Sequence, residues 1–286
     1  MHSTGILLNS IVPLIALLAG LWWMNARGPS WAVENSDPDY IYFFNSLLLA
    51  DHFKPVWHTD HPGTPSQVFG AVTLRLSHLL QFHGNDPFVF SVLKNPESYM
   101  RNLVVVGAAL NAAMLFFLGF ALVKIGMRPI LAIASQVFCA LSPAVVMHSF
   151  GRFAAEPLLF FFSLGSCIFW AYSLREDSVA IEIRVGKRET SILLSIALSL
   201  IFAGFACGVK ITAFPLLLLG VFTLRTMAQK IIGASIFVIS FFVATVVTTP
   251  WRTFFGFFAK LLTHKGRYGG GGAWLGGFEN ICNEYG

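Results

Sequence analysis

Charged residues are scarce in this chain, and their scarcity excludes an ordinary soluble domain. Only 12% of the 286 residues are Asp, Glu, Lys or Arg, whereas 56% are hydrophobic and 29 residues are phenylalanine. A soluble domain carries roughly 25% charged residues. Long apolar runs account for the difference, so the sequence predicts a polytopic membrane protein. The formal charge of +5 does not indicate nucleic-acid binding, because basic residues in membrane proteins mostly orient the loops.

Cysteine motifs are also lacking. Cys139, Cys167 and Cys207 lie in apolar runs, only Cys282 lies in polar sequence, and no CxxC spacing occurs. This distribution argues against both disulfides and zinc–thiolate sites. The first hydrophobic segment lacks the basic stretch that precedes the core of a signal peptide, so we expect it to be a retained span.

The apolar runs predict an all-α fold, a single transmembrane helix bundle over residues 1–286 with about seven spans. Residues 191–224 would form a helix about 50 Å long, which exceeds a hydrocarbon core of about 30 Å. We therefore expect a break at the CGVK stretch, residues 207–210. The expected spans are 5–24, 102–123, 130–148, 154–173, 191–207, 211–224 and 231–249.

Basic residues divide the expected loops into two groups. Eight of them lie in three loops, which are 124–129, 174–190 and 225–230. The short loops on the other side hold only Arg152 and Lys210. Because Lys and Arg are enriched in cytoplasmic loops, we expect a cytoplasmic N-terminus in a bacterial inner membrane or an equivalent membrane. The segments 25–101 and 250–286 would then face outward.

Three outward segments are predicted to be helices in the membrane interface. In YIYFFNSLLLADHF, residues 40–53, aromatic and leucine side chains share one helical face, and Asn45 lies on the polar side. WRTFFGFFAKLL, residues 251–262, repeats this pattern, and residues 66–80 are a third candidate. Aromatic side chains in such helices favour the depth of the lipid headgroups.

Acidic residues open the first of these helices, in the stretch SDPDY at residues 36–40. Asp37 can cap the helix, Pro38 suits its first position, and Asp39 favours the positive end of the helix dipole. An acid fixed at a helix N-terminus beside a membrane is also well placed for catalysis. A structural and a catalytic role are both compatible with this stretch.

A second polar stretch, HTDHPGTP at residues 58–65, places Asp60 and His61 on a stiff turn. It can be a rigid polar loop, a phosphate contact or a divalent-cation site, since Asp and His both suit a cation. The spacing alone does not choose among them.

Further polar features are expected on the same side. Arg152 and Glu156 are i, i+4 and can form a simple surface pair, but Glu156 opens an apolar span, where ionisable residues are costly and usually functional. Lys210 can extend to the interface or neutralise a phosphate. HKGRYGGGGAW, residues 264–274, is either a loose chain end or a phosphate-binding lid.

Taken in order, these motifs resemble the GT-C glycosyltransferases, which use lipid-linked sugars and include protein O-mannosyltransferases and the aminoarabinose transferase of lipid A. SDPDYIYFFNSLLLADH resembles the acidic motif after the first span of that family, and DHPG resembles its acidic–proline turn. GRFAAEPLLFFF resembles the place where a later span of that family begins with an acidic residue. GFACGVKITAFP resembles the family's glycine-rich span that ends in a Lys. Asp-Pro-Asp replaces the family's Asp-Glu pair, and its further spans and C-terminal part are missing.

The resemblance implies inverting transfer of a sugar from a polyprenyl-phosphate donor in the bilayer to an acceptor glycan, lipid or protein. Asp37 or Asp39 would be the general base, and Tyr40 and His264 would orient the substrate. The donor phosphate would be contacted by His61, Arg152, Lys210 and Arg267.

Asp60 and Glu156 would orient those cations, bind sugar hydroxyls or hold a divalent metal ion, and the resemblance leaves the need for a metal open. The alternative is a polytopic transporter component or a non-catalytic lipid-binding membrane protein. Ionisable residues in the middle of the membrane would favour a transporter. The charges here are expected at one interface instead, which favours chemistry on a membrane-borne substrate.

Overall fold

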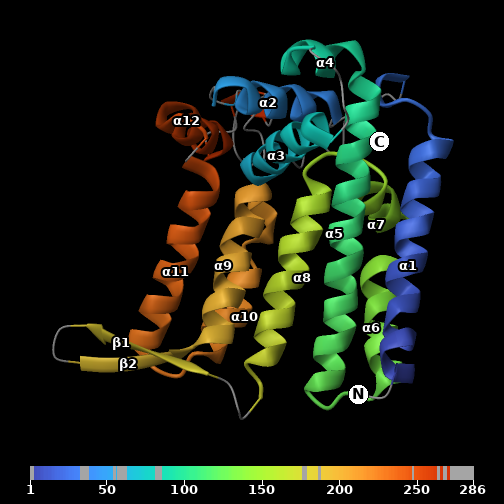
Figure 1. The fold of residues 1–286 in the computed structure, drawn as a ribbon. Coiled ribbons are helices and arrows are strands. Elements are labelled where there is room, and N and C mark those ends of the chain that lie inside the picture. Colours follow the sequence, from blue (N-terminus) through green and yellow to red (C-terminus); the bar gives the residue numbers. More distant parts are fainter. Residues whose placement is uncertain are drawn as a thin grey trace, which may run out of the picture.

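The fold is a bundle of long helices with a layer of shorter helices lying across one end (Figure 1). The computed structural model describes residues 3–32, 39–53, 56, 63–80, 86–175, 179–185, 188–246, 248–262, 265–266 and 269–270. The bundle elements are α1 (Ser3–Ala26), α5 (Pro96–Lys124), α6 (Pro129–Ala140), α7 (Pro143–Val145), η2 (Val146–Phe150), α8 (Glu156–Tyr172), α9 (Leu194–Val209), η3 (Ile211–Ala213), α10 (Leu216–Thr223) and α11 (Met227–Val246).

The crossing layer defines what we call the α2–α3 end of the bundle. It contains η1 (Ser30–Ala32), α2 (Asp39–His52), α3 (Thr64–Leu80), α4 (Phe88–Lys94) and α12 (Trp251–Leu262). The opposite end carries a hairpin of β1 (Ala180–Val185) and β2 (Arg188–Leu193), so we call it the hairpin end. Two further short strands, β3 (Lys265–Gly266) and β4 (Gly269–Gly270), follow α12.

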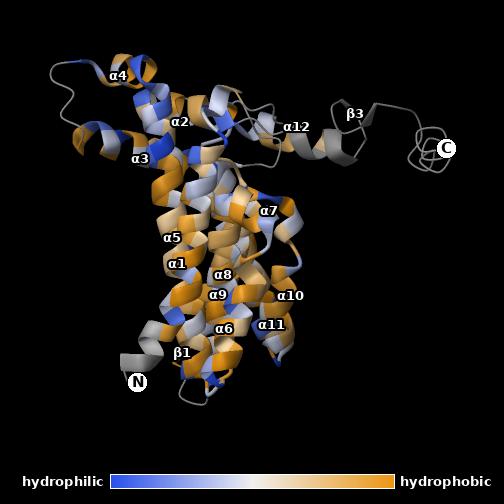
Figure 2. Ribbon diagram, turned by 90° about the vertical axis from the view of Figure 1, so that its right-hand side faces the viewer, coloured by the Kyte–Doolittle hydropathy of each residue, from blue (hydrophilic) through white to orange (hydrophobic). Residues whose placement is uncertain are grey.

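Three helices of the described chain are long and apolar enough to cross a membrane, namely α1, α5 and α11. The pair formed by α6 and the segment Pro143–Phe150 is bent by 66° and makes a fourth if it counts as one span. The large apolar side chains on these helices are widely exposed, with Phe138 89% exposed and Ile239 62% exposed. Figure 2 shows apolar residues over most of the bundle's length, as expected for surfaces that contact lipid.

Several expected spans differ from the helices observed. The span 130–148 is not one straight helix, because α6 ends at Ala140 and Pro143 begins a new turn, whose Val145 N–H donates to Ser142 Oγ at 3.2 Å. Residues 191–193 belong to β2 rather than to the start of a span, and the expected loop 174–190 contains β1 and the first residues of β2. The expected span 211–224 is only a short turn, η3, followed by the 8 residues of α10.

Other expectations from the sequence are confirmed. The described chain is mostly α-helical, and α9 ends at Val209, within the CGVK stretch where a break was expected. Residues 40–53, 66–80 and 251–262 do form helices, and these lie across the end of the bundle (Figure 1). The loops also sort into the two expected groups at opposite ends. Their assignment to the two sides of a membrane stays a prediction.

The prediction of which side chains of α2 are buried is wrong in detail. Phe44 is 43% exposed, whereas Asn45 and Ser46 are buried. The two polar side chains are accommodated because each donates a hydrogen bond to a backbone carbonyl one turn earlier, Asn45 to Ile41 O at 2.8 Å and Ser46 to Tyr42 O at 2.7 Å. The helix is covered on more sides than a surface helix, since α3 packs along it.

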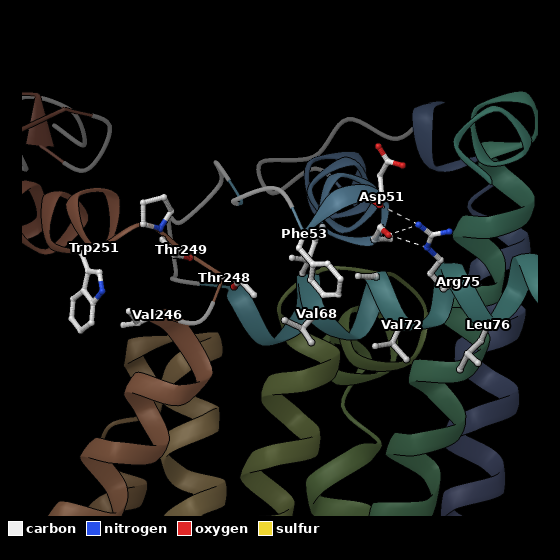
Figure 3. A pocket seen from close by; sticks show the side chains of 14 residues that line it. Asp51, Phe53, Val68, Val72, Arg75, Leu76, Val246, Thr248, Thr249 and Trp251 are labelled. Carbon is white, nitrogen blue, oxygen red and sulfur yellow. Dashed lines mark hydrogen bonds between the residues drawn. The ribbon is translucent and has the colours of Figure 1, made fainter. Parts of the chain in front are cut away.

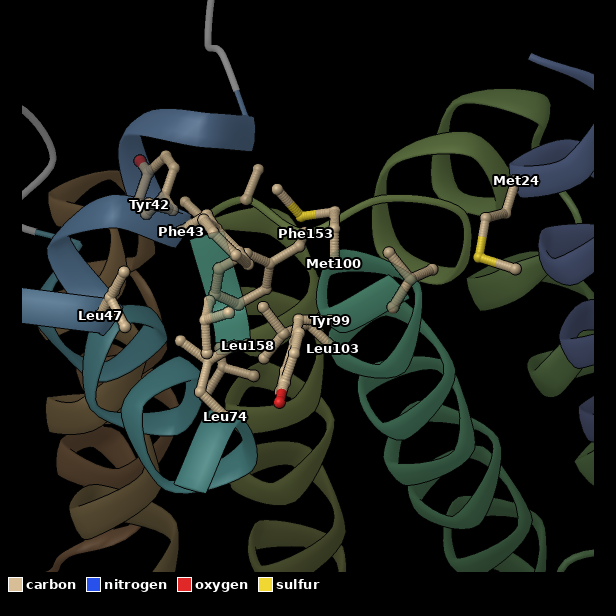
Figure 4. Close-up of a cluster of buried hydrophobic side chains, with 14 of the residues drawn as sticks. Met24, Tyr42, Phe43, Leu47, Leu74, Tyr99, Met100, Leu103, Phe153 and Leu158 are labelled. Atoms are coloured by element: carbon tan, nitrogen blue, oxygen red, sulfur yellow. The ribbon is translucent and has the colours of Figure 1, made fainter. Parts of the chain in front are cut away.

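A buried apolar cluster joins the α2–α3 layer to the bundle (Figure 4). Tyr42 and Phe43 of α2 pack there with Leu74 of α3, Met100 of α5 and Phe153 from the turn before α8. Burying such side chains stabilises the fold by roughly 1.5–3 kcal/mol each. The layer is therefore a fixed part of the protein rather than a loose surface segment.

Close packing of α9 against α11 gives a first testable prediction. A Cβ added at Gly204 would lie 2.7 Å from the Phe237 carbonyl oxygen and 2.7 Å from Ser240 Cβ. Gly204→Ala should therefore lower the thermal unfolding temperature in detergent, because overpacking costs about 1–3 kcal/mol and outweighs the gain of roughly 0.5–1 kcal/mol in helix propensity. Gly107→Ala is the matched control, since its Cβ would come no closer than 3.8 Å to a neighbour. A Gly204→Ala protein as stable as the Gly107→Ala protein would contradict this packing.

Candidate functional site

The side chain of Asp39 is buried between two arginines at the α2–α3 end. Arg152 Nε and Nη2 donate to Asp39 Oδ1 at 2.8 and 2.6 Å, and Arg27 Nη2 donates to Asp39 Oδ2 at 3.0 Å. The three side chains are 3–7% exposed. We call Arg27, Asp39 and Arg152 the Asp39 cluster. It joins the end of α1, the start of α2 and the turn before α8.

Among the described residues, the Asp39 cluster has two positive groups for one negative group. It holds two guanidinium groups and one carboxylate, and His148 Nδ1 lies 3.3 Å from Arg152 Nη1. The Nε atom of Arg27 is buried and has no hydrogen-bond partner among the described residues. Because a buried polar group without a partner is costly, this Nε atom favours a hydrogen-bond acceptor close by.

A second ion pair lies between α8 and the break after α9. Lys210 Nζ donates to Glu156 Oε1 at 2.5 Å, and the two side chains are 21% and 24% exposed. Glu156 is the first residue of α8, and Lys210 has the extended backbone that ends α9. This pair is more accessible than the Asp39 cluster, so it can be reached by a substrate.

The expected i, i+4 surface pair of Arg152 with Glu156 does not form. Residues 151–155 precede α8 and are not helical, so the spacing of four does not place the two side chains on one face. Arg152 binds Asp39, and Glu156 binds Lys210. Both partners come from distant parts of the sequence.

The start of α3 lies beside Lys210. Gly63 donates its backbone N–H to the Val209 carbonyl at 3.1 Å and has a φ of +68°, which suits glycine. Thr64, the first residue of α3, is fully buried, and its hydroxyl has no partner among the described residues. The positive end of a helix, a buried hydroxyl and a lysine thus lie close together. All three favour an anion.

Tyr40 is held by an acidic residue of α5. Its hydroxyl donates to Glu97 Oε1 at 2.6 Å, and Glu97 Oε2 also accepts from the Ser30 N–H at 3.2 Å. Partial burial raises the pKa of Tyr40 above its ordinary value, and the hydrogen bond to Glu97 and the charges of Glu97 and Asp39 raise this pKa further. The phenol therefore stays protonated and can position neighbours but not accept a proton.

An apolar groove of about 770 Å³ lies at the same end of the bundle, between α3 and the junction of α11 with α12 (Figure 3). We call it the α3–α11 groove. Its walls include Val68, Val72 and Leu76 of α3 and, opposite them, Val246 and Trp251. Its size is in the range of small-molecule and cofactor sites, roughly 300–1,000 Å³.

Polar groups are few in the α3–α11 groove. Arg75 donates to the Ala50 carbonyl at 2.7 Å, and its guanidinium stacks 4.0 Å above the ring of Phe88. The hydroxyls of Thr248 and Thr249 are buried and have no partner among the described residues. A largely apolar channel whose polar lining is one arginine, one aspartate (Asp51) and two threonines suits an amphiphile rather than a polar metabolite.

The structure brings together four of the residues predicted from sequence, in two pairs: Asp39 with Arg152, and Glu156 with Lys210. Tyr40 lies next to them, bound to Glu97. The remaining candidates, Asp37, Asp60, His61, His264 and Arg267, lie outside the described residues. Among the described residues no three His, Cys, Asp or Glu side chains form a metal site, and the metal interpretation of Asp60 with Glu156 stays a prediction.

Sequence reasoning missed Arg27, Glu97 and Arg75. Arg27 directly follows an apolar span, a position that commonly signals no more than anchoring at the interface. Glu97 follows Pro96 at the start of α5, where an acid is expected for the helix dipole alone. The sequence around Arg27 and Glu97 therefore does not predict which residue either of them contacts.

Comparison with protein-family models, with curated proteins and with solved structures found no match for this chain.

Proposed function

We propose that this chain is an integral membrane glycosyltransferase that takes a sugar from a polyprenyl-phosphate donor. The observation that carries the proposal is the meeting, at one end of an apolar bundle, of two buried arginines, an accessible Lys210–Glu156 pair and the apolar α3–α11 groove. A donor of this class has the same three parts: a phosphate, a sugar and a long apolar chain. The motif resemblance to GT-C enzymes supports the same assignment.

The lipid part of the donor is proposed to enter between α3 and α11. The groove walls are aliphatic and aromatic, and Trp251 is 57% exposed at its edge, as aromatic residues at the headgroup level are. The start of α3 lies against Val209, next to Lys210, while its later turns line the groove. One helix would therefore contact both the phosphate and the chain attached to it.

The phosphate is proposed to bind Lys210 and the N-terminus of α3. In a direct displacement, the acceptor oxygen bonds to the anomeric carbon as the bond from that carbon to the phosphate oxygen breaks, and the phosphate leaves with the bonding electrons. Negative charge grows on the leaving phosphate, so a fixed cation lowers the barrier. Lys210 keeps two further N–H donors beside the one given to Glu156.

The acceptor hydroxyl must lose its proton to a base. Both carboxylate oxygens of Asp39 accept hydrogen bonds from buried arginines, so Asp39 is held as a positioning residue and its oxygens are not presented to an acceptor hydroxyl. Asp37, two residues earlier, is the base that we propose. Asp39 would fix the start of α2 and thereby the place of Asp37.

Two measurements on the purified full chain test this proposal. Native mass spectrometry should detect bound polyprenyl phosphate, and a labelled-sugar assay should detect transfer. Asp37→Asn should reduce transfer by roughly 10²–10⁴-fold and leave lipid binding intact. Asp86→Asn is the matched control, because Asp86 is 40% exposed and pairs only loosely with Lys94 at 3.4 Å. Full transfer by Asp37→Asn would remove Asp37 as the base, and failure to bind the lipid would remove the function itself.

A further inference from the structure

A second cavity, of about 540 Å³, lies at the hairpin end, at the opposite end of the bundle from the proposed chemistry. We call it the hairpin-end cavity. It is enclosed by the residues after α8, by β2, by the first turn of α9, by the end of α10 and by the start of α11. The proposed glycosyl transfer makes no use of it.

The walls of the hairpin-end cavity are held by hydrogen bonds. Trp170 Nε1 donates to Thr223 Oγ1 at 2.9 Å, which ties α8 to the end of α10. Gln229 Oε1 accepts from the Arg225 N–H at 3.0 Å, and Gln229 Nε2 donates to the Ser191 carbonyl at 2.8 Å, which ties α11 to β2. These bonds fix the shape of the cavity without any ligand.

The lining of the cavity is basic. Arg175 and Arg225 both line it, and it has no acidic lining residue among the part of the chain that the structure describes. The guanidinium of Arg225 forms no ion pair with any described residue. Guanidinium groups bind phosphate oxygens through paired N–H donors, so two arginines in one cavity favour a phosphate group.

Exposed apolar side chains next to the cavity indicate where such a phosphate would come from. Leu174, which lines the cavity, is 57% exposed, and Phe222 and Met227, within two positions of lining residues, are 76% and 72% exposed. A soluble anion would gain nothing from this apolar surface, whereas the chains of a lipid would cover it. Basic cavities between membrane helices bind anionic lipid headgroups in this way.

We infer that the hairpin-end cavity binds the phosphate headgroup of an anionic phospholipid from the leaflet at that end. Arg175 and Arg225 would hold the phosphate, and the acyl chains would lie along Leu174 and Phe222. This inference does not depend on the proposed glycosyl transfer.

Native mass spectrometry of the detergent-purified full chain tests the inference. The chain is titrated with phosphatidylglycerol, phosphatidylcholine or inorganic phosphate. The protein should retain phosphatidylglycerol in preference to phosphatidylcholine. Arg175→Gln with Arg225→Gln should weaken phosphatidylglycerol binding by roughly tenfold or more, since both charged contacts are lost. Arg252→Gln replaces an exposed arginine of α12 at the other end, removes one positive charge by the same substitution and should change nothing.

A second variant keeps the test decisive if the double substitution does not fold. Ser191→Trp keeps both arginines but puts a large side chain into the cavity from an exposed position of β2, and it should weaken phosphatidylglycerol binding as well. Equal retention of phosphatidylglycerol by all variants would overturn the inference. Binding of inorganic phosphate without any preference for phosphatidylglycerol would also overturn it, because the site would then take a soluble anion.

Discussion

Asp39→Ala should destabilise the protein by roughly 3–5 kcal/mol, the cost of removing one partner from a buried ion pair. The substitution leaves the guanidinium groups of Arg27 and Arg152, both at most 7% exposed, without the carboxylate that separates them. Arg27 also donates to Ser30 Oγ at 3.1 Å, but a neutral hydroxyl does not replace the lost carboxylate. We expect a lower thermal unfolding temperature and a smaller monodisperse fraction in detergent.

Variants that change the charge balance separate this effect from simple loss of packing. Arg27→Met keeps the two hydrogen bonds from Arg152 to Asp39 Oδ1 and should cost much less than Asp39→Ala. Replacing all three residues by apolar ones, Arg27→Met with Asp39→Leu and Arg152→Met, should recover most of the stability, because apolar groups can replace a buried ion cluster. Asp86→Ala breaks an exposed pair and should change stability by about 0–1 kcal/mol. If Asp39→Ala unfolds at the wild-type temperature, the cluster is not what holds α2 in place.

The measured stability of the Asp39→Ala protein also decides how a loss of sugar transfer in that variant is interpreted. An unfolded Asp39→Ala protein cannot transfer sugar, so inactivity alone would not make Asp39 the base. The separate Asp37→Asn variant is needed because Asp37 precedes α2 and is not one of the three residues of the Asp39 cluster. A stable, lipid-binding but inactive Asp37→Asn protein would assign the base without this ambiguity.

Sequence patterns predicted the parts of this structure that depend on local composition. The apolar runs gave the long helices α1, α5 and α11, and the excessive length of 191–224 indicated the break that the structure has after Val209. The amphipathic stretches gave α2, α3 and α12. The gathering of Asp39, Arg152, Glu156 and Lys210 at one end followed from counting spans, because each lies at a helix end.

The pairing of these charges could not be predicted from local spacing. Arg152 and Glu156 are four residues apart, yet the non-helical turn between them sends each to a partner more than 50 residues away. The bend after α6 depends on Ser142 and Pro143 inside an otherwise continuous apolar run. The hairpin does have a sequence pattern that predicts a strand, since Ile181, Ile183 and Val185 alternate with polar residues at the period of a strand.

Lys210→Met should reduce sugar transfer by roughly 10²–10³-fold, the typical cost of removing one group that stabilises charge in the transition state. This prediction rests on the proposed function, in which the Lys210 ammonium faces the leaving phosphate. The unfolding temperature should fall moderately, because Glu156 is 24% exposed but its buried Oε2 atom has no hydrogen-bond partner among the described residues, and the carboxylate loses its cation. A labelled-sugar assay together with thermal unfolding would measure the two effects separately.

The double variant Glu156→Gln with Lys210→Met distinguishes a catalytic from a structural role for this pair. It removes both charges, so no unpaired ion remains, and the protein should unfold near the wild-type temperature. If the pair only joins α8 to the end of α9, transfer should return with stability. If Lys210 acts on the phosphate, transfer should stay low, and Lys210→Arg should recover part of it because the positive charge is kept. Lys230→Met, at the hairpin end, controls for the loss of one positive charge and should transfer sugar at the wild-type rate.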